Sequence, residues 1–321
     1  MKQDKTFFAQ LITIIFTIIF MGALSAKADI KVVTTIKPLH SLISNVMDGI
    51  GEPSLIIEGS TSPHSFVLKP SHAKLIEQAD IIFWIGEDIE TFMEKPLESI
   101  AKNAKKVSFM ELSSIEKLKF REENIFEHED HDDHGHDEKK DHDDHGDGHE
   151  GHHHGEFDAH IWLDPANAKE MLHEIAHELA DLDPANADKY ESNADNTIKS
   201  IDDMISSVSS SINKDAKFIV FHDAYQYFEK RFGVATAGAL TLNTDVLPGA
   251  KQISEIQEVI AERDIKCIFS EPQFNPKIIE TIAQDTGIKT GVLDPLGSIF
   301  DAGKSQYFTL INDLGDKLKD C

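Results

Sequence analysis

Residues 266–293 read KCIFSEPQFNPKIIETIAQDTGIKTGVL, and this stretch indicates the fold class. KCIFS (266–270) and KTGVL (289–293) are short apolar runs typical of strands, and NPKIIETIAQDTG (275–287) has the pattern of a helix that ends at glycine. Short apolar strands that alternate with helices form parallel sheets, because parallel strands need a crossover connection. The stretch therefore predicts a strand–helix–strand unit of an α/β fold.

The same alternation extends over most of the chain. In the C-terminal part we expect further strands at 217–221 and 234–240 and helices at 223–232, 248–264 and 303–319. In the N-terminal part we expect strands at 30–35, 53–59 and 81–86, with helices beginning at Pro38 and Pro70. The pattern predicts two α/β lobes, each with a parallel sheet.

Two helical segments with related openings lie between these parts. DPANAKEMLHEIAHELADL covers 164–182, and the second segment runs from Pro184 to Ile212 without an internal breaker. At 1.5 Å per residue the second helix is on the order of 40 Å long, which predicts a rigid connector. We therefore expect an N-terminal lobe at 29–183, a long linker helix at 184–213 and a C-terminal lobe at 214–321, with a ligand held in the cleft between the lobes.

The N-terminus has the pattern of a secretory signal peptide at 1–28. Lys2 and Lys5 precede an uncharged run from Thr6 to Ala26, and Ala26-Lys27-Ala28 supplies a cleavage signal. An uncleaved membrane anchor is the alternative, because the uncharged run is almost long enough to span a bilayer. The cleavage signal favours removal, so we expect an exported, periplasmic protein that is not inserted in the membrane.

The net charge of the chain limits the classes of partner that it can bind. The formal net charge of −26 argues against nucleic acid or an anionic membrane surface as a partner, and it suits a cationic ligand.

The chain has two cysteines, Cys267 and Cys321. An even count in an oxidising compartment predicts a disulfide between them, and the alternative is a buried free thiol beside a frayed terminal one.

Residues 128–154 (HEDHDDHGHDEKKDHDDHGDGHEGHHH) contain no apolar residue. A segment with nothing to bury cannot offset the entropy lost on ordering, so we expect a disordered loop in the N-terminal lobe. Imidazole and carboxylate are metal ligands, so the composition favours weak metal binding over an inert acidic linker. The candidate ligands are its ten histidines: His128, His131, His134, His136, His142, His145, His149, His152, His153 and His154.

A second set of metal-capable residues lies just past the expected strands. His222 follows KFIVF, Asp294 follows KTGVL, and His64 lies in STSPHSF after PSLIIEG. His160 lies in FDAHIWLDP. Glu271 follows KCIFS and precedes a proline, and it either binds the metal or forms hydrogen bonds beside the site. Zinc binds imidazole and carboxylate tetrahedrally, whereas manganese favours more oxygen ligands. Three imidazoles therefore favour Zn²⁺, although copper or nickel would also bind such a set in vitro.

One competing motif lies in the first helical segment. His173-Glu174-Ile175-Ala176-His177 matches the H-E-x-x-H helix of zinc proteases. The match is short, its histidines fall on the polar flank of the expected helix, and Ala180 and Asp183 stand where the extended motif has Gly and His. We therefore expect no catalytic residues.

Taken together, STSPHSFVLKPSHAKLIEQADIIFWIG, DAHIWLDPANA, FHDAYQYFEKRFG, EPQF and VLDPLGS resemble the periplasmic zinc-binding proteins of bacterial ABC importers, in cluster A-I of the solute-binding proteins. The resemblance implies two lobes joined by one long helix, zinc between them, and a His- and acid-rich loop as an accessory. It implies His64, His160 and His222 as the metal histidines. The manganese branch has glutamate in place of His222.

The resemblance leaves the fourth ligand open. Asp294 matches an aspartate that family members use, and Pro63 stands where some zinc members have a further glutamate, so Asp294 and water remain the alternatives. The implied partner is an inner-membrane permease with a cytoplasmic ATPase, served by a monomeric binding protein. An exported zinc buffer or adhesion protein without a transporter is the remaining alternative.

Overall fold

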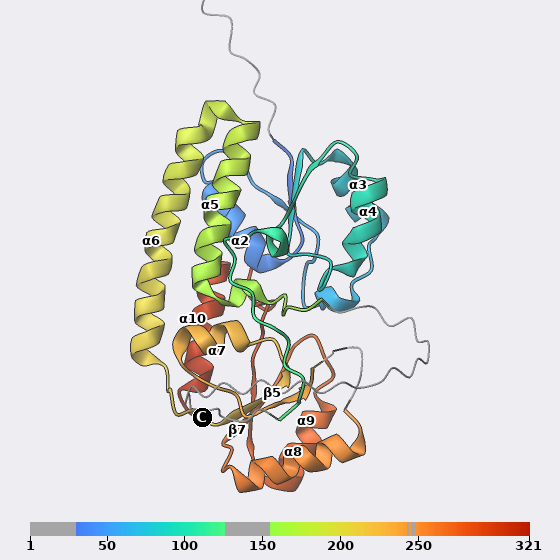
Figure 1. The fold of residues 1–321 in the computed structure, drawn as a ribbon, viewed down its shortest axis with the longest axis vertical. Helices are drawn as coiled ribbons and strands as arrows, with labels where there is room; N and C mark the ends of the chain where they lie inside the picture. Colours follow the sequence, from blue (N-terminus) through green and yellow to red (C-terminus); the bar gives the residue numbers. More distant parts are fainter. Residues whose placement is uncertain (1–29, 126–154, 243, 245–247) are drawn as a thin grey trace, which may run out of the picture. The chain divides into compact units, whose positions relative to one another are not determined.

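Two four-stranded parallel sheets form the framework of the protein (Figure 1). The structure is a computed structural model, and it describes residues 30–125, 155–242, 244 and 248–321. The predicted signal peptide and the ten histidines of the acidic loop lie outside the described residues. None of the helices in the described part of the chain has the length and apolarity needed to span a bilayer.

The N-terminal sheet has the strand order β2-β1-β3-β4, with every pair parallel. Prolines at the first turns of two of its helices suit those positions, since the missing N–H has no helical partner there. The elements of this lobe are β1 (Val32–Thr34), α2 (Lys37–Val46), β2 (Ser54–Leu55), α3 (Pro70–Gln78), β3 (Ile81–Trp84), α4 (Glu94–Ser99) and β4 (Lys105–Ser108).

The C-terminal sheet has the order β6-β5-β7-β8 and is also parallel throughout. Its helices lie where the alternation predicts them, although α7 begins three residues later than expected and β6 five residues later. The elements are β5 (Phe218–His222), α7 (Gln226–Phe232), β6 (Ala239–Thr241), α8 (Ala250–Glu262), β7 (Cys267–Ser270), α9 (Lys277–Thr286), β8 (Lys289–Val292) and α10 (Gln306–Leu318).

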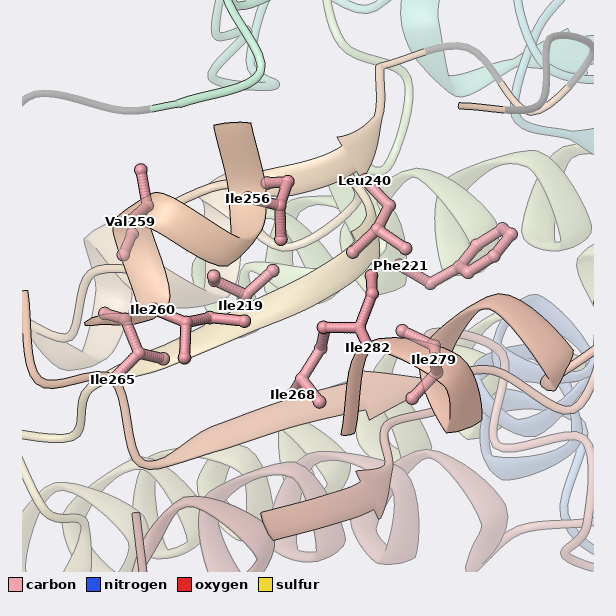
Figure 2. Close-up of a cluster of buried hydrophobic side chains, with 11 residues drawn as sticks. Ile219, Phe221, Leu240, Ile256, Val259, Ile260, Ile265, Ile268, Ile279 and Ile282 are labelled. Carbon is pink, nitrogen blue, oxygen red and sulfur yellow. The ribbon is translucent and has the colours of Figure 1, made fainter. Parts of the chain in front are cut away.

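Helices α8 and α9 cover one face of the C-terminal sheet (Figure 2). Ile256, Val259 and Ile260 recur at helical spacing on α8, and they pack with Ile219 of β5 and Ile268 of β7. Burial of each such side chain contributes about 1.5–3 kcal/mol, so the apolar stripe holds the helix on the sheet.

The disulfide predicted between Cys267 and Cys321 is present in the structure. Cys267 is the first residue of β7, and Cys321 follows α10. The bridge therefore attaches the end of the chain to the N-terminal end of a central strand.

Helices α5 (Pro165–Leu182) and α6 (Ala187–Ser211) lie between the two sheets in sequence, and they run side by side (Figure 1). The predicted linker helix at 184–213 is a 3₁₀ turn, Pro184–Asn186, followed by α6. Helix α10 also packs on α6, where a Cβ added to Gly315 would lie 2.9 Å from Cγ1 of Val208. Glycine at 315 is therefore required by the close approach of the two helices.

Contacts beyond the linker helix also join the lobes. Helix α10 packs against α2, where Ser41 Oγ accepts a bond from Tyr307 N and donates one to Lys304 O, both at 3.0 Å. The segment before residue 125 runs to the C-terminal sheet, where Ile125 forms an antiparallel bridge with Gly238 (Figure 1). The two lobes are thus parts of one compact unit, Lys31–Cys321, and the lobe boundaries at 183 and 214 stay predictions.

Candidate metal-binding site

His64 lies in the loop that follows β2. The short 3₁₀ helix Pro63–Ser65 holds it, and Ser62 Oγ accepts a hydrogen bond from the His64 backbone N–H at 3.3 Å. Proline at the first helical position and serine at the N-cap both favour this turn. The side chain is half-buried.

His160 lies just before the 3₁₀ helix Ile161–Leu163, and Asp158 orients it. Asp158 Oδ1 accepts bonds from the His160 backbone N–H at 2.9 Å and from the ring Nδ1–H at 2.6 Å. Both residues are buried. Because Nδ1 donates to the carboxylate, Nε2 carries the free lone pair.

His222 is the last residue of β5, and Glu271 orients it in the same way. Glu271 follows β7, which neighbours β5 in the parallel sheet, so the carboxyl ends of the two strands bring the residues together. The ring Nδ1–H of His222 donates to Glu271 Oε1 at 2.6 Å. Glu271 therefore supports the site by hydrogen bonding, one of the two roles that its position before proline allowed.

The three histidines converge through Nε2. His160 Nε2 lies 3.4 Å from His64 Nε2 and 3.3 Å from His222 Nε2. Two nitrogens bound at 2.0–2.1 Å to a tetrahedral zinc lie about 3.3 Å apart, so the spacing suits one zinc ion. When both rings are neutral and donate through Nδ1, Nε2 of His160 and Nε2 of His222 each present a lone pair to a cation bound between them.

The electrostatics also favour a cation. Burial raises the pKa of Asp158 to about 7 because the charged carboxylate loses its hydration, although the His160 backbone N–H and the nearby His222 lower it in part. Burial likewise raises the pKa of Glu271. A divalent cation at the Nε2 atoms would stabilise both carboxylates in their charged form.

Two spaces of different size border the cluster. Trp162, Phe274 and Pro295 help to line the smaller one, of about 10 Å³, which is room for one water at most. The same three histidines also border a larger cavity of about 190 Å³ that Asp88 and Phe120 line as well. An ion held by three imidazoles would therefore have room for a water ligand from the larger cavity.

Asp294 lies apart from the group that the three histidines form. Its Oδ1 accepts bonds from Gln273 Nε2 at 2.8 Å and Leu296 N at 3.1 Å. Its Oδ2 accepts bonds from Ser298 N at 2.6 Å and Ser298 Oγ at 2.7 Å. In this structure the carboxylate organises the turn after β8.

Comparison with known proteins adds the family. The family of ZnuA, described as the periplasmic component A of the zinc-uptake complex, matches residues 32–321. The chain belongs to the ZnuA family.

Similar proteins support this membership over more than nine-tenths of the chain. The chain is 44% identical over 315 residues to the high-affinity zinc uptake system protein ZnuA of Brucella abortus (strain 2308), with 94% of each chain covered. It is 34% identical over 301 residues to the protein of the same name from Yersinia pestis, with 92% of each covered.

Solved structures show the same fold. A crystal structure of ZnuA has a TM-score of 0.71 at 21% identity, covering 90% of this chain and 99% of the other. The laminin-binding protein of Streptococcus agalactiae, titled a bifunctional protein with adhesin and metal transporting activity, has a TM-score of 0.70 at 23% identity, covering 90% and 100%.

Membership of the ZnuA family, a family of transport binding proteins, also bears on the H-E-x-x-H stretch of α5. In the structure His173 and His177 are exposed, and the metal-capable group on this helix is Glu174, His177 and Glu178. His173 is outside that group, and Lys105 pairs with Glu178. The two-histidine arrangement of a zinc protease is not formed by these residues.

Sequence reasoning pointed to the three histidines that the structure brings together, and it missed Asp158. The signal was the spacing Asp158-Ala159-His160, which lets one carboxylate bond both the backbone and the ring of the histidine two residues on. Sequence reasoning also missed β4. This strand begins with the exposed Lys105 and Lys106 and is buried only at Val107 and Ser108, so it lacks the apolar run expected of a strand.

Proposed function

We propose that this protein captures Zn²⁺ in the periplasm through His64, His160 and His222 and delivers it to the permease of an ABC importer. The observation that carries the proposal is the convergence of three Nε2 atoms at 3.3 and 3.4 Å, with two of the rings oriented by buried carboxylates. Membership of the ZnuA family and the names of the similar proteins support zinc as the cargo.

The fourth ligand in this proposal is a water molecule from the larger cavity. Asp294 already accepts four hydrogen bonds, and turning it toward the histidines would leave Gln273 and the 296–298 backbone without their acceptor. A water in the larger cavity, which the three histidines line, would need no such loss.

We assign the His-rich segment 128–154 an accessory role. Its ten histidines offer many weak arrangements, and ordering a glycine-containing acidic chain around an ion costs conformational entropy. The tight site therefore belongs to the three histidines, and the segment adds weaker equivalents of zinc.

Replacement of His222 by alanine tests the proposal. The variant loses one of three imidazoles and should bind zinc more weakly by orders of magnitude, measured by competition with a chelator on metal-free protein. A His173→Ala/His177→Ala variant is the matched control, since it also removes histidines but from the exposed face of α5. Wild-type affinity in His222→Ala, or loss of the tight site in the control, would contradict the assignment.

Delivery needs a separate measurement. Cells that lack their own copy of the protein should regain growth in zinc-depleted medium with the wild-type chain and not with His222→Ala. Zinc binding without any rescue in the presence of the permease would favour an exported zinc buffer over a transport component.

A further inference from the structure

The larger cavity borders all three histidines of the cluster, and its other walls come from both lobes. Asp88 lies in the turn after β3, and Phe120 and Arg121 lie in the segment that crosses to the C-terminal sheet. Because the small space beside Trp162 and Phe274 has room for one water at most, the larger cavity offers an ion the wider approach to the histidines in the described part of the chain.

The three charged side chains on the cavity wall, Asp88, Arg121 and Asp223, differ in their pairing. Arg121 Nη1 contacts Asp223 Oδ1 at 2.6 Å, and Nη2 contacts Glu229 Oε2 at 2.9 Å, so the positive charge of Arg121 is balanced. Asp88 is half-buried, and its Oδ1 accepts a bond from the Gly155 backbone N–H at 2.8 Å. In the described part of the chain no basic side chain forms an ion pair with Asp88. Its negative charge is therefore available to a cation in the cavity.

Asp88 is not one of the residues that converge on the metal position. The group with ligand atoms within 4.8 Å of one another consists of the three histidines. A carboxylate beside the path of the ion, but outside its final set of ligands, can replace one or more waters of hydration before the imidazoles do.

We infer that Asp88 is a transient ligand that takes zinc from water and passes it through this cavity to His64, His160 and His222. This inference rests on the proposed function. A group that stabilises the ion on the way in also stabilises it on the way out. Asp88 should therefore raise the association and dissociation rates by similar factors and leave the dissociation constant nearly unchanged.

Replacement of Asp88 by asparagine isolates the charge. The side-chain oxygen of asparagine can still accept the bond from Gly155 N–H, so the turn should keep its structure. Glu87→Gln is the matched control, because Glu87 is the neighbouring exposed residue and lines a different hollow, with Trp84 and Lys106. The melting temperatures of both metal-free variants should match that of the wild type.

The experiment measures rates with Zn²⁺ alone. Stopped-flow mixing gives the association rate with metal-free protein, and an excess of chelator gives the dissociation rate. In Asp88→Asn both rates should fall about tenfold, at the low end of known steering effects, while the dissociation constant changes less than threefold. Glu87→Gln should exchange zinc at the wild-type rates.

Three results would overturn the inference. Wild-type rates in Asp88→Asn would show that the ion does not use this carboxylate. Equal slowing in Asp88→Asn and Glu87→Gln would assign the effect to the overall negative field. A large loss of affinity through faster dissociation would make Asp88 a ligand of the bound ion. Failure of the proposed function looks different, because His222→Ala would then bind zinc as the wild type does.

Discussion

At the scale of single residues, the candidate site depends on pairs rather than on isolated histidines. Asp158 and Glu271 each accept the Nδ1–H of one ring at 2.6 Å, which selects the tautomer that leaves Nε2 free for metal. The carboxylates are buried, so neither ring can exchange its partner for water without disturbing the fold.

Glu271→Gln tests the value of such a pair. Glutamine is neutral and can present an N–H where Glu271 presents an acceptor, so His222 should lose its orientation and part of its basicity. Zinc affinity should fall about 10–100-fold, as for other carboxylates that support metal-bound histidines. Glu262→Gln at the exposed end of α8 is the control. Unchanged affinity in Glu271→Gln, measured by chelator competition, would mean that the pair has no role in binding.

The pH dependence of zinc affinity should reflect His222 first. Burial lowers the pKa of His222, but the negative charges of Glu271, Asp223 and Asp158 together raise it by more. The pKa of His222 therefore lies above the ordinary value of 6.5. Burial and the nearby His222 hold the pKa of His160 well below that value. Only neutral imidazole binds metal, so protons compete with zinc as the pH falls through the pKa of His222. Affinity should be constant at high pH and begin to fall before pH 6.5. A constant affinity between pH 7 and pH 5 would argue against histidine ligands.

At the scale of elements, α10 connects parts of the molecule that are distant in sequence. It packs on α2 of the N-terminal lobe and on α6, and the disulfide attaches Cys321, the third residue after the helix, to β7. Tyr307 of this helix donates its hydroxyl to Trp162 O at 2.8 Å, and Trp162 Nε1 donates to Pro295 O at 2.8 Å. Trp162 lines the smaller space beside the histidine cluster, so α10 supports the site through Trp162.

Removal of the disulfide should affect stability and spare zinc binding. The bridge closes a loop with a sequence separation of 54 residues. Chain-entropy reasoning gives about 4 kcal/mol of stabilisation. The free energy of unfolding of Cys267→Ser/Cys321→Ser should be lower by about this amount, so the variant should unfold at a lower urea concentration than the wild type. Cys267 lies at the opposite end of β7 from Glu271, so the dissociation constant for zinc should stay within a few-fold of the wild type. Two titratable thiols in unfolded, unreduced protein from the periplasm would contradict the bridge.

At the scale of the whole molecule, the lobes are joined by more than the linker helix. The crossing segment binds the C-terminal sheet through Asn124 and Ile125, and Gly155 returns to Asp88 of the N-terminal lobe. The histidines come from both lobes, so a bound ion would add one further connection between them. Zinc should therefore raise the melting temperature of the whole unit.

Deletion of Glu129–His153 tests which zinc ions the His-rich segment binds and which the three converging histidines bind. The three converging histidines and their carboxylates lie outside the deleted stretch. The variant should keep one tightly bound zinc and the fold, and it should lose the weaker equivalents in a calorimetric titration. Growth should slow only when zinc is scarce. Loss of the tight site would place the segment in the primary site, and retention of every equivalent would make it an inert linker.

Much of the fold is readable from the sequence because the signals are local. The period of apolar residues in 217–221, 266–270 and 250–262 determines strands and helices, and their alternation determines a parallel sheet. The motifs around His64, His160 and His222 identify the three histidines, and the even cysteine count identifies the bridge. Each of these depends on residues that are neighbours in sequence or on composition alone.

Only the tertiary structure decides how these parts meet. It pairs Glu271 with His222 across two strands, turns Asp294 toward Ser298, brings α10 onto α2, and leads the segment before residue 125 to the second sheet. These contacts join residues far apart in the chain, and local periodicity contains no information on which distant partner a polar side chain finds. The physical reason is burial, because a carboxylate removed from water must take whichever donors the packing of both lobes places beside it.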